Sequence, residues 1–576
     1  MSHGRTIRDY KKEEAMEKRE VKVLYGEEDS KEKIISLEEG TSYEELAKDL
    51  GDLFSGQVTL ARVDNQLHEL GELIEPSVKE ITFLDTCDTD GYRVYMRTLS
   101  FVFLVAVQEI FPDKRVVFEH SISGGTYCSI REGQTSIVID SWTKKSIQEQ
   151  MQKIIDLDQT IERLEYSLER AKELFRKENR QDKVQVLEYR NKENVAIYKL
   201  GQVYDSFYGY LLPSTGHVST FDLELFNHGL VLIGPERNVK GLVRNFVPQR
   251  KLSEAYKELE SWSELQGISQ VSHLNKLIEE GNIGEVCRVA EALQGHKIMS
   301  IAQEIHKNNK RIVLISAPSS SGKTSFAYKL RTSLRVLGLR PTSISLDDYY
   351  VNRVDTPLDE KGNYDFESLY AIDLDLFNKD LNSLLKGQKV ERIRFDFMDG
   401  VRVYTGEDIQ LYGSDPIIIE GIHALNPLLT SHIEEIFKYK IYLSVITQIN
   451  LDDHNRIPTT DLRLMRRMAR DKEFRGKPVE NTILEWKNVR EGERRNIFPY
   501  QEEADVVFNS SFIYEIAALK AILMDDLRNI SKESPASIEA KRLLSILEYF
   551  LPLVDTSDIV NTSILREFIG GSKIVY

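Results

Sequence analysis

A chain of 576 residues is too long for one hydrophobic core and predicts about three or four domains. Its formal net charge of −16 argues against a broad surface for nucleic acid. The three cysteines (Cys87, Cys128 and Cys287) lie far apart, so we expect neither a disulfide framework nor a cysteine metal site. The longest apolar run, 101–107, is far below the roughly 20 residues that span a bilayer, and residues 1–22 contain no apolar signal core. These features predict a cytoplasmic protein without a membrane partner.

The first part of the chain predicts a small α+β domain over residues 21–83, after an N-terminal extension of residues 1–20. Thr41 or Ser42, followed by Glu44 and Glu45, is a helix start signal, and the helix is expected at 42–50. Strands are expected at 21–24, 58–63 and 81–84.

A second domain is predicted over residues 84–235, opening with an apolar helix at 99–110. Within it, apolar residues at helical spacing over 144–178 predict one long amphipathic helix. That helix is expected to pack on a core or form a short coiled-coil hairpin, with partner binding as the alternative.

Two further segments are mainly helical by periodicity. Residues 236–310 are predicted to form a helical connector that is interrupted near 281–284. Residues 531–576 are predicted to form a C-terminal tail, with one helix at 538–551 and an apolar end that docks on another domain.

From residue 311 onward, short β-rich runs alternate with helical segments, which is typical of a parallel sheet flanked by helices. The predicted strands are 311–316, 342–346, 415–420, 438–445 and 505–509. We therefore assign residues 311–530 to an α/β domain, so the whole chain is expected to be a multidomain α+β and α/β protein. Ligands of such sheets bind beyond the carboxyl ends of the strands, so the candidate site lies there.

The first of these strands is followed by a sequence with the Walker A pattern, in which Ala317 replaces the first glycine. Backbone N–H groups of such a loop and of the helix after it cradle phosphates. Lys323 is expected to reach the β- and γ-phosphates of ATP, and the Thr324 hydroxyl to bind Mg²⁺. The candidate ATP-binding residues are Ser319, Ser320, Ser321, Gly322, Lys323, Thr324 and Ser325.

Three further features follow later strands. Asp347 and Asp348 follow the second strand, where a carboxylate can accept the proton of an acceptor hydroxyl, although such a pair is more often a solvated turn or helix cap. Glu420 ends the third strand and is a candidate for the magnesium site. A cluster of arginines suits either phosphoryl oxygens or a solvated basic helix. Its members are Arg463, Arg466, Arg467, Arg470 and Arg475.

In this order the motifs resemble those of the uridine kinase and phosphoribulokinase family, over residues 311–509. The matching stretches are Ser319–Thr324, Leu346-Asp347-Asp348-Tyr349-Tyr350, Asn363-Tyr364-Asp365-Phe366, Phe395-Asp396-Phe397, Ile419-Glu420-Gly421-Ile422, Arg463–Asp471 and Ala504-Asp505-Val506-Val507. The resemblance implies a P-loop kinase that uses ATP and Mg²⁺, with a nucleoside as its small-molecule substrate. It also implies a homo-oligomer.

The resemblance further implies individual roles. Asp347 would be the general base, and Thr324 and Glu420 would serve the metal. Asp365 would hold the ribose hydroxyls. The implied catalytic residues are Asp347, Lys323, Arg467 and Arg470, of which the two arginines form a lid over the phosphates. The implied substrate-binding residues are Tyr350, Asp365, Phe395, Arg475, Lys477 and Glu485.

The base pocket departs from the family pattern. Phe395 and Gly400 stand where those enzymes carry Tyr and His, and Lys477 and Glu485 stand where they usually carry Arg and Gln. Because a pocket reads a base through its hydrogen bonds, these changes put the identity of the acceptor in question but leave the phosphoryl-transfer residues intact.

Residues 21–235 resemble the N-terminal region of threonyl-tRNA synthetase, with its TGS domain and its editing domain. The resemblance rests on Ile81–Asp85, Arg97–Val102, Tyr198–Gly201 and Pro213–Gly216. The editing residues of that family are replaced here by Thr98, Val102, Phe207 and Leu211, none of which binds a metal or moves a proton. We therefore expect no editing activity, and we interpret the isolated His120 as a structural or surface histidine.

Three functions are compatible with the sequence. The first is a nucleoside kinase, for uridine or cytidine first, and the second is a kinase of another small alcohol. The third is a regulatory protein linked to tRNA or another RNA, in which nucleotide binding acts as a switch. The acidic composition and the emptied editing site make the third the weakest.

Overall fold

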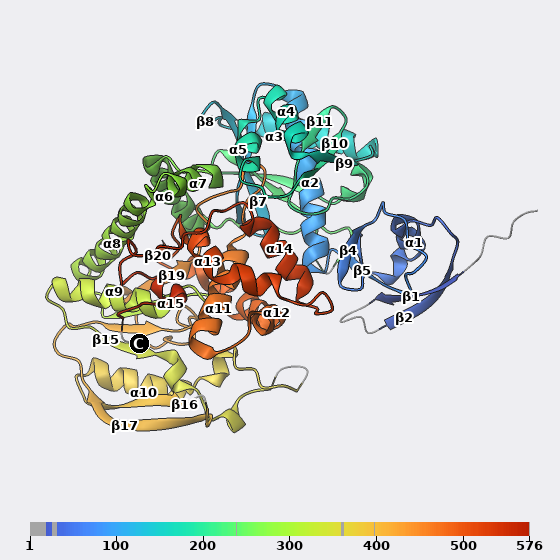
Figure 1. Ribbon diagram of the computed structural model, residues 1–576. Coiled ribbons are helices and arrows are strands. Elements are labelled where there is room, and N and C mark those ends of the chain that lie inside the picture. Colours follow the sequence, from blue (N-terminus) through green and yellow to red (C-terminus); the bar gives the residue numbers. More distant parts are fainter. Residues whose placement is uncertain (1–18, 26–30, 238, 359–361, 397, 575–576) are drawn as a thin grey trace, which may run out of the picture. The chain divides into compact units, whose positions relative to one another are not determined.

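The computed structural model describes residues 19–25, 31–237, 239–358, 362–396 and 398–574. The predicted extension of residues 1–20 therefore lies almost wholly outside the described residues, as does Phe397. The chain forms two compact units, shown with their elements in Figure 1. Unit 1 contains Met1–Lys114, Val138–Leu164 and Ala196–Phe246, and unit 2 contains Arg115–Ile137, Glu165–Val195 and Val247–Tyr576. The domain limits given above remain a prediction. Among the described residues, no helix combines the length and the apolar character needed to cross a membrane.

Unit 1 begins with a five-stranded sheet in the order β2-β1-β5-β3-β4. Its elements are β1 (Arg19–Tyr25), β2 (Lys31–Leu37), α1 (Tyr43–Asp49), β3 (Val58–Val63), β4 (Gln66–Glu69) and β5 (Glu80–Asp85). The predicted start of α1 is confirmed, because the Ser42 hydroxyl and the Glu45 carboxylate form a capping box. The predicted strands are also confirmed, but β2 and β4 were not predicted because their exposed residues show no buried face.

The remainder of unit 1 is built around α2 (Thr89–Ile110), which is longer than the predicted helix at 99–110. The other elements are α3 (Ser141–Asp156), β11 (Val203–Asp205), β12 (Asp222–Phe226) and β13 (Gly229–Ile233), with β9 (Glu162–Ser167) and β10 (Asn194–Leu200) at the limits between the units. β10 pairs with β11 and β12 pairs with β13, both antiparallel.

The prediction of one long helix over 144–178 is wrong. The helix α3 ends at Asp156, β9 follows, and a separate helix α4 (Leu168–Lys177) begins with Ser167 as its N-cap. The chain turns at Asp158, whose φ is 44° and whose carboxylate accepts hydrogen bonds from the Ser214 hydroxyl and the Gly216 amide. These partners are distant in sequence, so helical periodicity alone could not reveal the break.

Gly91 allows α2 to pack against the end of β5. A Cβ atom at this position would lie 2.0 Å from the Asp85 carbonyl oxygen, a contact that only backbone movement could relieve. We expect Gly91→Ala to lower the free energy of unfolding by about 1–3 kcal/mol, measured by urea denaturation. Gly295→Ala is the control, because a Cβ at this helical position meets no atom within 4 Å and should be neutral or stabilising. Equal effects of the two substitutions would contradict this packing argument.

Unit 2 contains a hairpin of β6 (Arg115–Ile122) and β7 (Gly125–Glu132), extended by β8 (Thr135–Ser136). Its helices before the sheet are α4, α5 (Gln181–Leu187), α6 (Arg250–Gln266), α7 (Val271–Glu279) and α8 (Ile283–Lys307). The predicted helical connector and its interruption near 281–284 are confirmed by the last three.

His120 on β6 is buried between two tyrosines, with ring centroids 3.7 Å from Tyr256 and 4.8 Å from Tyr127. Loss of hydration lowers the pKa of His120 to about 3, so the ring is neutral at physiological pH. The interpretation of His120 as a structural residue is confirmed.

The main sheet of unit 2 is parallel, in the order β15-β18-β14-β19-β20. The strands are β14 (Ile312–Ser316), β15 (Thr342–Ser345), β18 (Ile417–Glu420), β19 (Lys438–Ser444) and β20 (Val506–Asn509), so all five predicted strands are confirmed. A hairpin of β16 (Val390–Asp396) and β17 (Val401–Ile409) stands apart from this sheet. The helices are α9 (Lys323–Val336), α10 (Leu374–Leu385), α11 (Thr459–Arg475), α12 (Val479–Asn496), α13 (Glu515–Arg528), α14 (Ser537–Leu547) and α15 (Arg566–Ile569).

The loop before α11 is fixed by a fully buried ion pair. Lys183 Nζ on α5 lies 3.1 Å from Asp452 Oδ1, and both side chains are inaccessible to solvent. Asp452 also accepts hydrogen bonds from the amides of His454 and Asn455. Because removal of one partner would leave a buried charge, this pair constrains where α11 begins.

Candidate active site

The site lies at the carboxyl ends of three neighbouring strands. In the sheet, β18 stands between β14 and β15, and Glu420 at its end is in register with Ile315 and Ser345. The phosphate loop follows β14 and Asp347 follows β15, so both flank Glu420. The topology therefore brings together residues that are about 100 positions apart in the sequence.

The phosphate loop has the backbone expected of an anion cradle. Ser320 and Gly322 have left-handed backbones, with φ of 61° and 77°, and α9 begins directly after Gly322. Ala317, in place of the first glycine of the pattern, is fully buried and does not adopt a positive φ, so its Cβ causes no backbone strain. The helix begins at Lys323, two residues before the predicted start.

Lys323, Asp347, Glu367 and Glu420 act on one another electrostatically. Loss of hydration raises the pKa of Glu420 to about 7, Lys323 opposes this rise and Asp347 adds to it. Burial likewise raises the pKa of Glu367, where Glu493 and Asp347 act in the same direction and Lys323 opposes. One cation is thus surrounded by several carboxylates that favour a further positive charge nearby, such as a magnesium ion.

Asp347 and Asp348 are distinguished by their surroundings. The charge of Asp347 acts on Glu420, Glu367 and Tyr350, which belong to the cluster around Lys323. Asp348 instead faces the β16 hairpin, where the Phe395 amide, Arg394 and Arg392 act on its carboxyl. Asp347 is therefore the carboxylate placed beside the phosphate loop.

Two of the five arginines do not have the roles expected from sequence. Arg466 is fully buried, pairs with Glu515 and donates to the carbonyl oxygens of Ser510 and Ser320, at 2.8 and 3.3 Å. Arg463 is also buried and pairs with Glu493, whose Oε1 accepts the Ser319 amide at 3.0 Å. These two side chains therefore support the phosphate loop from beneath, and neither is solvated nor available to phosphate.

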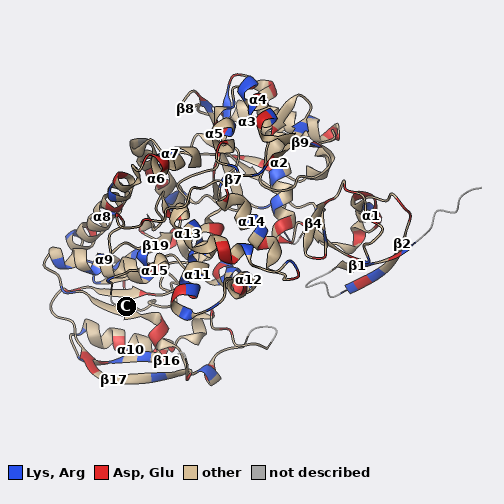
Figure 2. Cartoon of the chain, viewed as in Figure 1, with Lys and Arg blue, Asp and Glu red and all other residues tan. Residues whose placement is uncertain are grey.

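The other three arginines share Asp471 as an anchor. Arg467 Nε, Arg470 Nε and Arg475 Nη1 lie 3.4, 3.7 and 3.2 Å from the Asp471 carboxylate, which is buried. Arg467 also donates to the Ser319 hydroxyl at 2.8 Å, so this guanidinium touches the phosphate loop. Acidic and basic residues are mixed on α11 and α12, as Figure 2 shows.

Comparison with known proteins matches this region. Residues 312–516 fit the model described as the Phosphoribulokinase / Uridine kinase family. This part of the chain is a domain of that family. The uridine kinase of Macrococcus caseolyticus is 29% identical over 197 residues, which cover 34% of this chain and 86% of that protein. A solved structure titled as a possible uridine kinase from Bacillus stearothermophilus aligns over 35% of this chain and 89% of its own, with 20% identity and a TM-score of 0.24.

A further similarity concerns a different class of protein. The threonine–tRNA ligase of Caldanaerobacter subterraneus subsp. tengcongensis is 29% identical over 214 residues, which are 36% of this chain and 32% of the ligase. In unit 1 the four positions that replace the editing residues (Thr98, Val102, Phe207 and Leu211) are all buried. The Thr98 hydroxyl is used in hydrogen bonds with the Val94 carbonyl and the Leu212 amide. These positions therefore form packed core in place of a hydrolytic site.

The residues expected to bind the acceptor in the kinase-family domain fall into two groups. Tyr350 and Phe395 pack edge to face with ring centroids 5.6 Å apart, and Tyr350 is within electrostatic range of Asp347. Asp365 lies in a turn in which its Oδ1 accepts the Glu367 amide. Lys477 and Glu485, in contrast, pair with each other beyond α11.

Gly400 shows why the base pocket differs from the family pattern. Its φ is 71°, and a Cβ atom there would lie 2.8 Å from Cβ and Nε of Arg353. The Arg353 amide also donates to the Gly400 carbonyl at 2.8 Å. The arginine thus fills the space beside Gly400, and a histidine could not enter without backbone strain and displacement of Arg353.

Sequence reasoning missed several residues of the site. Glu367 and His423 lie within electrostatic range of Lys323, and His423 is almost fully buried with burial lowering its pKa to about 4. Glu493 and Glu567 contact the phosphate loop and the first turn of α9. Glu367 could have been found from its place two residues after Asp365, whereas nothing near Glu493 or Glu567 in the sequence signals a contact with the loop.

The site was tested for its fit to ATP and Mg²⁺. The buried hydroxyls of Ser320 and Ser321 have no hydrogen-bond partner, which fits a loop built to meet another polar group. Thr324 is exposed at the start of α9, and Glu420 supplies a carboxylate nearby. No cluster of three or more His, Cys, Asp or Glu able to hold a metal occurs among the described residues, but magnesium at nucleotides needs only one or two protein ligands. The residues present therefore fit both groups.

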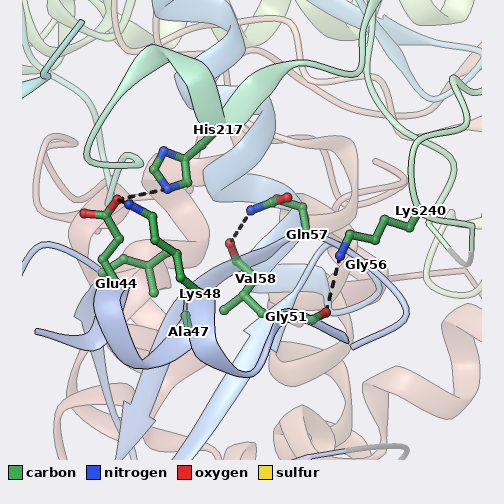
Figure 3. Close-up of a pocket in the computed structure, with 10 residues that line it drawn as sticks. Glu44, Ala47, Lys48, Gly51, Gly56, Gln57, Val58, His217 and Lys240 are labelled. Atoms are coloured by element: carbon green, nitrogen blue, oxygen red, sulfur yellow. Dashed lines mark hydrogen bonds and ion pairs between the residues drawn. The ribbon is translucent and has the colours of Figure 1, made fainter. Parts of the chain in front are cut away.

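A pocket in unit 1 has a different chemistry. As Figure 3 shows, His217 points to Glu44, with 3.4 Å between Nε2 and Oε1, and Lys240 reaches the Gly51 carbonyl oxygen at 3.3 Å. Lys48 pairs with the same Glu44 at 2.8 Å. The pocket is lined by Glu44, Ala47, Lys48, Gly51, Gly56, Gln57, Val58, Leu70, His217 and Lys240. Because its cationic groups are already paired within the protein, it does not point to a particular ligand.

Proposed function

We propose that this chain is an ATP-dependent kinase that transfers the γ-phosphate to the 5′-hydroxyl of a nucleoside, with uridine or cytidine as the first candidates. The observation that carries the proposal is the grouping of Lys323, Asp347 and Glu420 at the ends of adjacent strands beside the phosphate loop. The family match over residues 312–516 supports the same chemistry.

The proposed reaction assigns one task to each side chain. The phosphate loop binds the triphosphate, and Lys323 offsets charge on its β- and γ-phosphates. Asp347 accepts the proton of the acceptor hydroxyl as its oxygen bonds to the γ-phosphorus, and the bond from that phosphorus to the β-phosphate oxygen breaks, releasing ADP. Arg467 and Arg470 stabilise the charge on the transferred group. Thr324 and Glu420 would hold Mg²⁺, which neutralises phosphate charge when bound.

The acceptor pocket is proposed to use Tyr350, Asp365 and Phe395, with Arg475, Lys477 and Glu485 closing over it from α11 and α12. Asp365 would hold the ribose hydroxyls. Since Arg353 stands where the uridine–cytidine pattern has a histidine, another small alcohol is the alternative acceptor. By the same resemblance we propose a homo-oligomer in the cytoplasm, which light scattering of the purified chain would test.

The proposal predicts ADP release from MgATP by the purified chain in the presence of one class of small alcohol. The assay compares nucleosides with other small alcohols and uses Lys323→Ala as the blank. We expect turnover with uridine or cytidine, and at least about 10²-fold less with the blank, since the lysine stabilises charge on the transferred phosphoryl group. Turnover with a different alcohol alone would keep the kinase and reject the pyrimidine nucleosides. ATP binding without turnover on any acceptor would contradict the proposal.

The similarity to threonine–tRNA ligase favours a second candidate function, an RNA-linked regulator that uses nucleotide binding as a switch. Under this alternative, tRNA should copurify with the chain, and ATP hydrolysis should rise with tRNA and with no small alcohol. The buried, apolar replacement of the editing residues argues for the kinase instead.

A further inference from the structure

The C-terminal segment 563–570, which includes α15, packs on the phosphate loop. Ile564, Leu565 and Phe568 are fully buried. A Cβ atom on Gly322 would lie 2.4 Å from Ile564 Cγ2, so the isoleucine is in direct contact with the last residue of the loop. The apolar tail predicted from sequence to dock on another part of the chain therefore docks on the candidate nucleotide site.

Glu567 places a carboxylate at the phosphate-binding end of α9. Its Oε2 accepts a hydrogen bond from the Ser325 hydroxyl at 2.6 Å, and its Oε1 lies 3.9 Å from Nη1 of Arg470. Ser325 is in the first turn of α9 and is fully buried. A helix start of this kind attracts anions, and a nucleotide phosphate on this loop would approach the same hydroxyl and the same arginine.

The segment is also held by α11, which carries the proposed lid. The ring of Phe568 lies 4.7 Å from the guanidinium carbon of Arg466. Gly570, with a φ of 84°, turns the chain beside Glu473 of α11. The segment thus lies between the phosphate loop and α11, and Ser320, Ser321 and Gly322 are buried although the chain carries no nucleotide.

We propose that residues 563–570 are an autoinhibitory segment in which Glu567 occupies a phosphate position of the nucleotide site, so that MgATP must displace the segment in order to bind. This inference rests on the proposed function. It adds a regulatory step to it: any event that loosens the C-terminal segment raises the affinity for nucleotide.

The test measures MgATP binding to the full chain by calorimetry, without an acceptor. Glu567→Gln keeps the size of the side chain and removes the charge that competes with phosphate. We expect it to bind MgATP about tenfold more tightly than the unmodified chain, which corresponds to the loss of one charge-assisted hydrogen bond from the closed state. Asp558→Asn is the matched control, since this acid of the same tail pairs with Arg288 and makes no contact with the loop. Its affinity should be unchanged.

A second measurement does not depend on any substitution. Hydrogen exchange of the amides of 563–570 in the unmodified chain should become faster when MgATP is added, because the segment leaves the loop. Unchanged or slower exchange, or equal or weaker binding by Glu567→Gln, would show that the segment is a fixed wall of the site and would overturn the inference. Failure of the unmodified chain and of every variant to bind MgATP, with Lys323→Ala indistinguishable from them, would instead overturn the proposed function and this inference with it.

Discussion

Replacing Asp347 with asparagine is expected to lower turnover about 10³-fold while MgATP still binds, within the roughly 10²–10⁴-fold that general bases contribute. Asparagine keeps the shape of the side chain but cannot accept the proton of the acceptor hydroxyl. Asp347 is the carboxylate whose charge acts on Glu420 and Glu367 beside Lys323. The measurement is ADP release at saturating acceptor, together with calorimetric titration of MgATP.

The neighbouring Asp348 offers a matched control for this prediction. Asp348→Asn makes the same chemical change one residue away, but its carboxyl faces the Phe395 amide and the arginines of the β16 hairpin. We expect a much smaller loss of turnover for this variant. If Asp348→Asn were the inactive variant and Asp347→Asn retained most of its turnover, the assigned base would be wrong.

The second large effect concerns stability. Arg466→Met should lower the free energy of unfolding by about 3–5 kcal/mol, because it leaves the carboxylate of Glu515 buried without its partner. Both side chains are fully inaccessible to solvent, and Arg466 also holds the Ser320 carbonyl of the phosphate loop. Urea denaturation of the full chain would give this quantity.

Arg467→Met is the control for the loss at Arg466, because it removes the next arginine of the same helix. Arg467 is only partly buried and touches the Ser319 hydroxyl, so its loss should reduce turnover and leave stability within about 1 kcal/mol. A stable Arg466→Met variant with lowered turnover would instead return Arg466 to the phosphate-binding arginines.

Much of the kinase-family domain could be predicted from sequence because its signals are local. Each strand of the parallel sheet is a short apolar run bounded by turns, and the phosphate loop is a contiguous motif between a strand and a helix. The same holds for α1, where Ser42 and Glu45 are three residues apart and form the capping box. In these cases the interacting groups are close in sequence, so the pattern already contains the geometry.

The errors arose where distant residues decide the structure. The predicted helix over 144–178 is interrupted because Asp158 binds Ser214 and Gly216, more than 50 positions away. Arg463 and Arg466 read as a surface cluster, but buried acids on α12 and α13 pair with them. A charged residue gives the same sequence signal whether it is solvated or paired in a core, because the partner alone determines the difference.

By itself the sequence determined the parallel-sheet domain, the phosphate loop and the carboxylates that follow the strands, since these depend on local periodicity and short motifs. Only the tertiary structure decided which of two adjacent aspartates faces Lys323, which arginines are structural, and that Glu567 of the C-terminal segment contacts Ser325. These features require contacts between residues up to 242 positions apart. Such contacts depend on how the elements pack, and packing is a property of the whole unit that no local pattern contains.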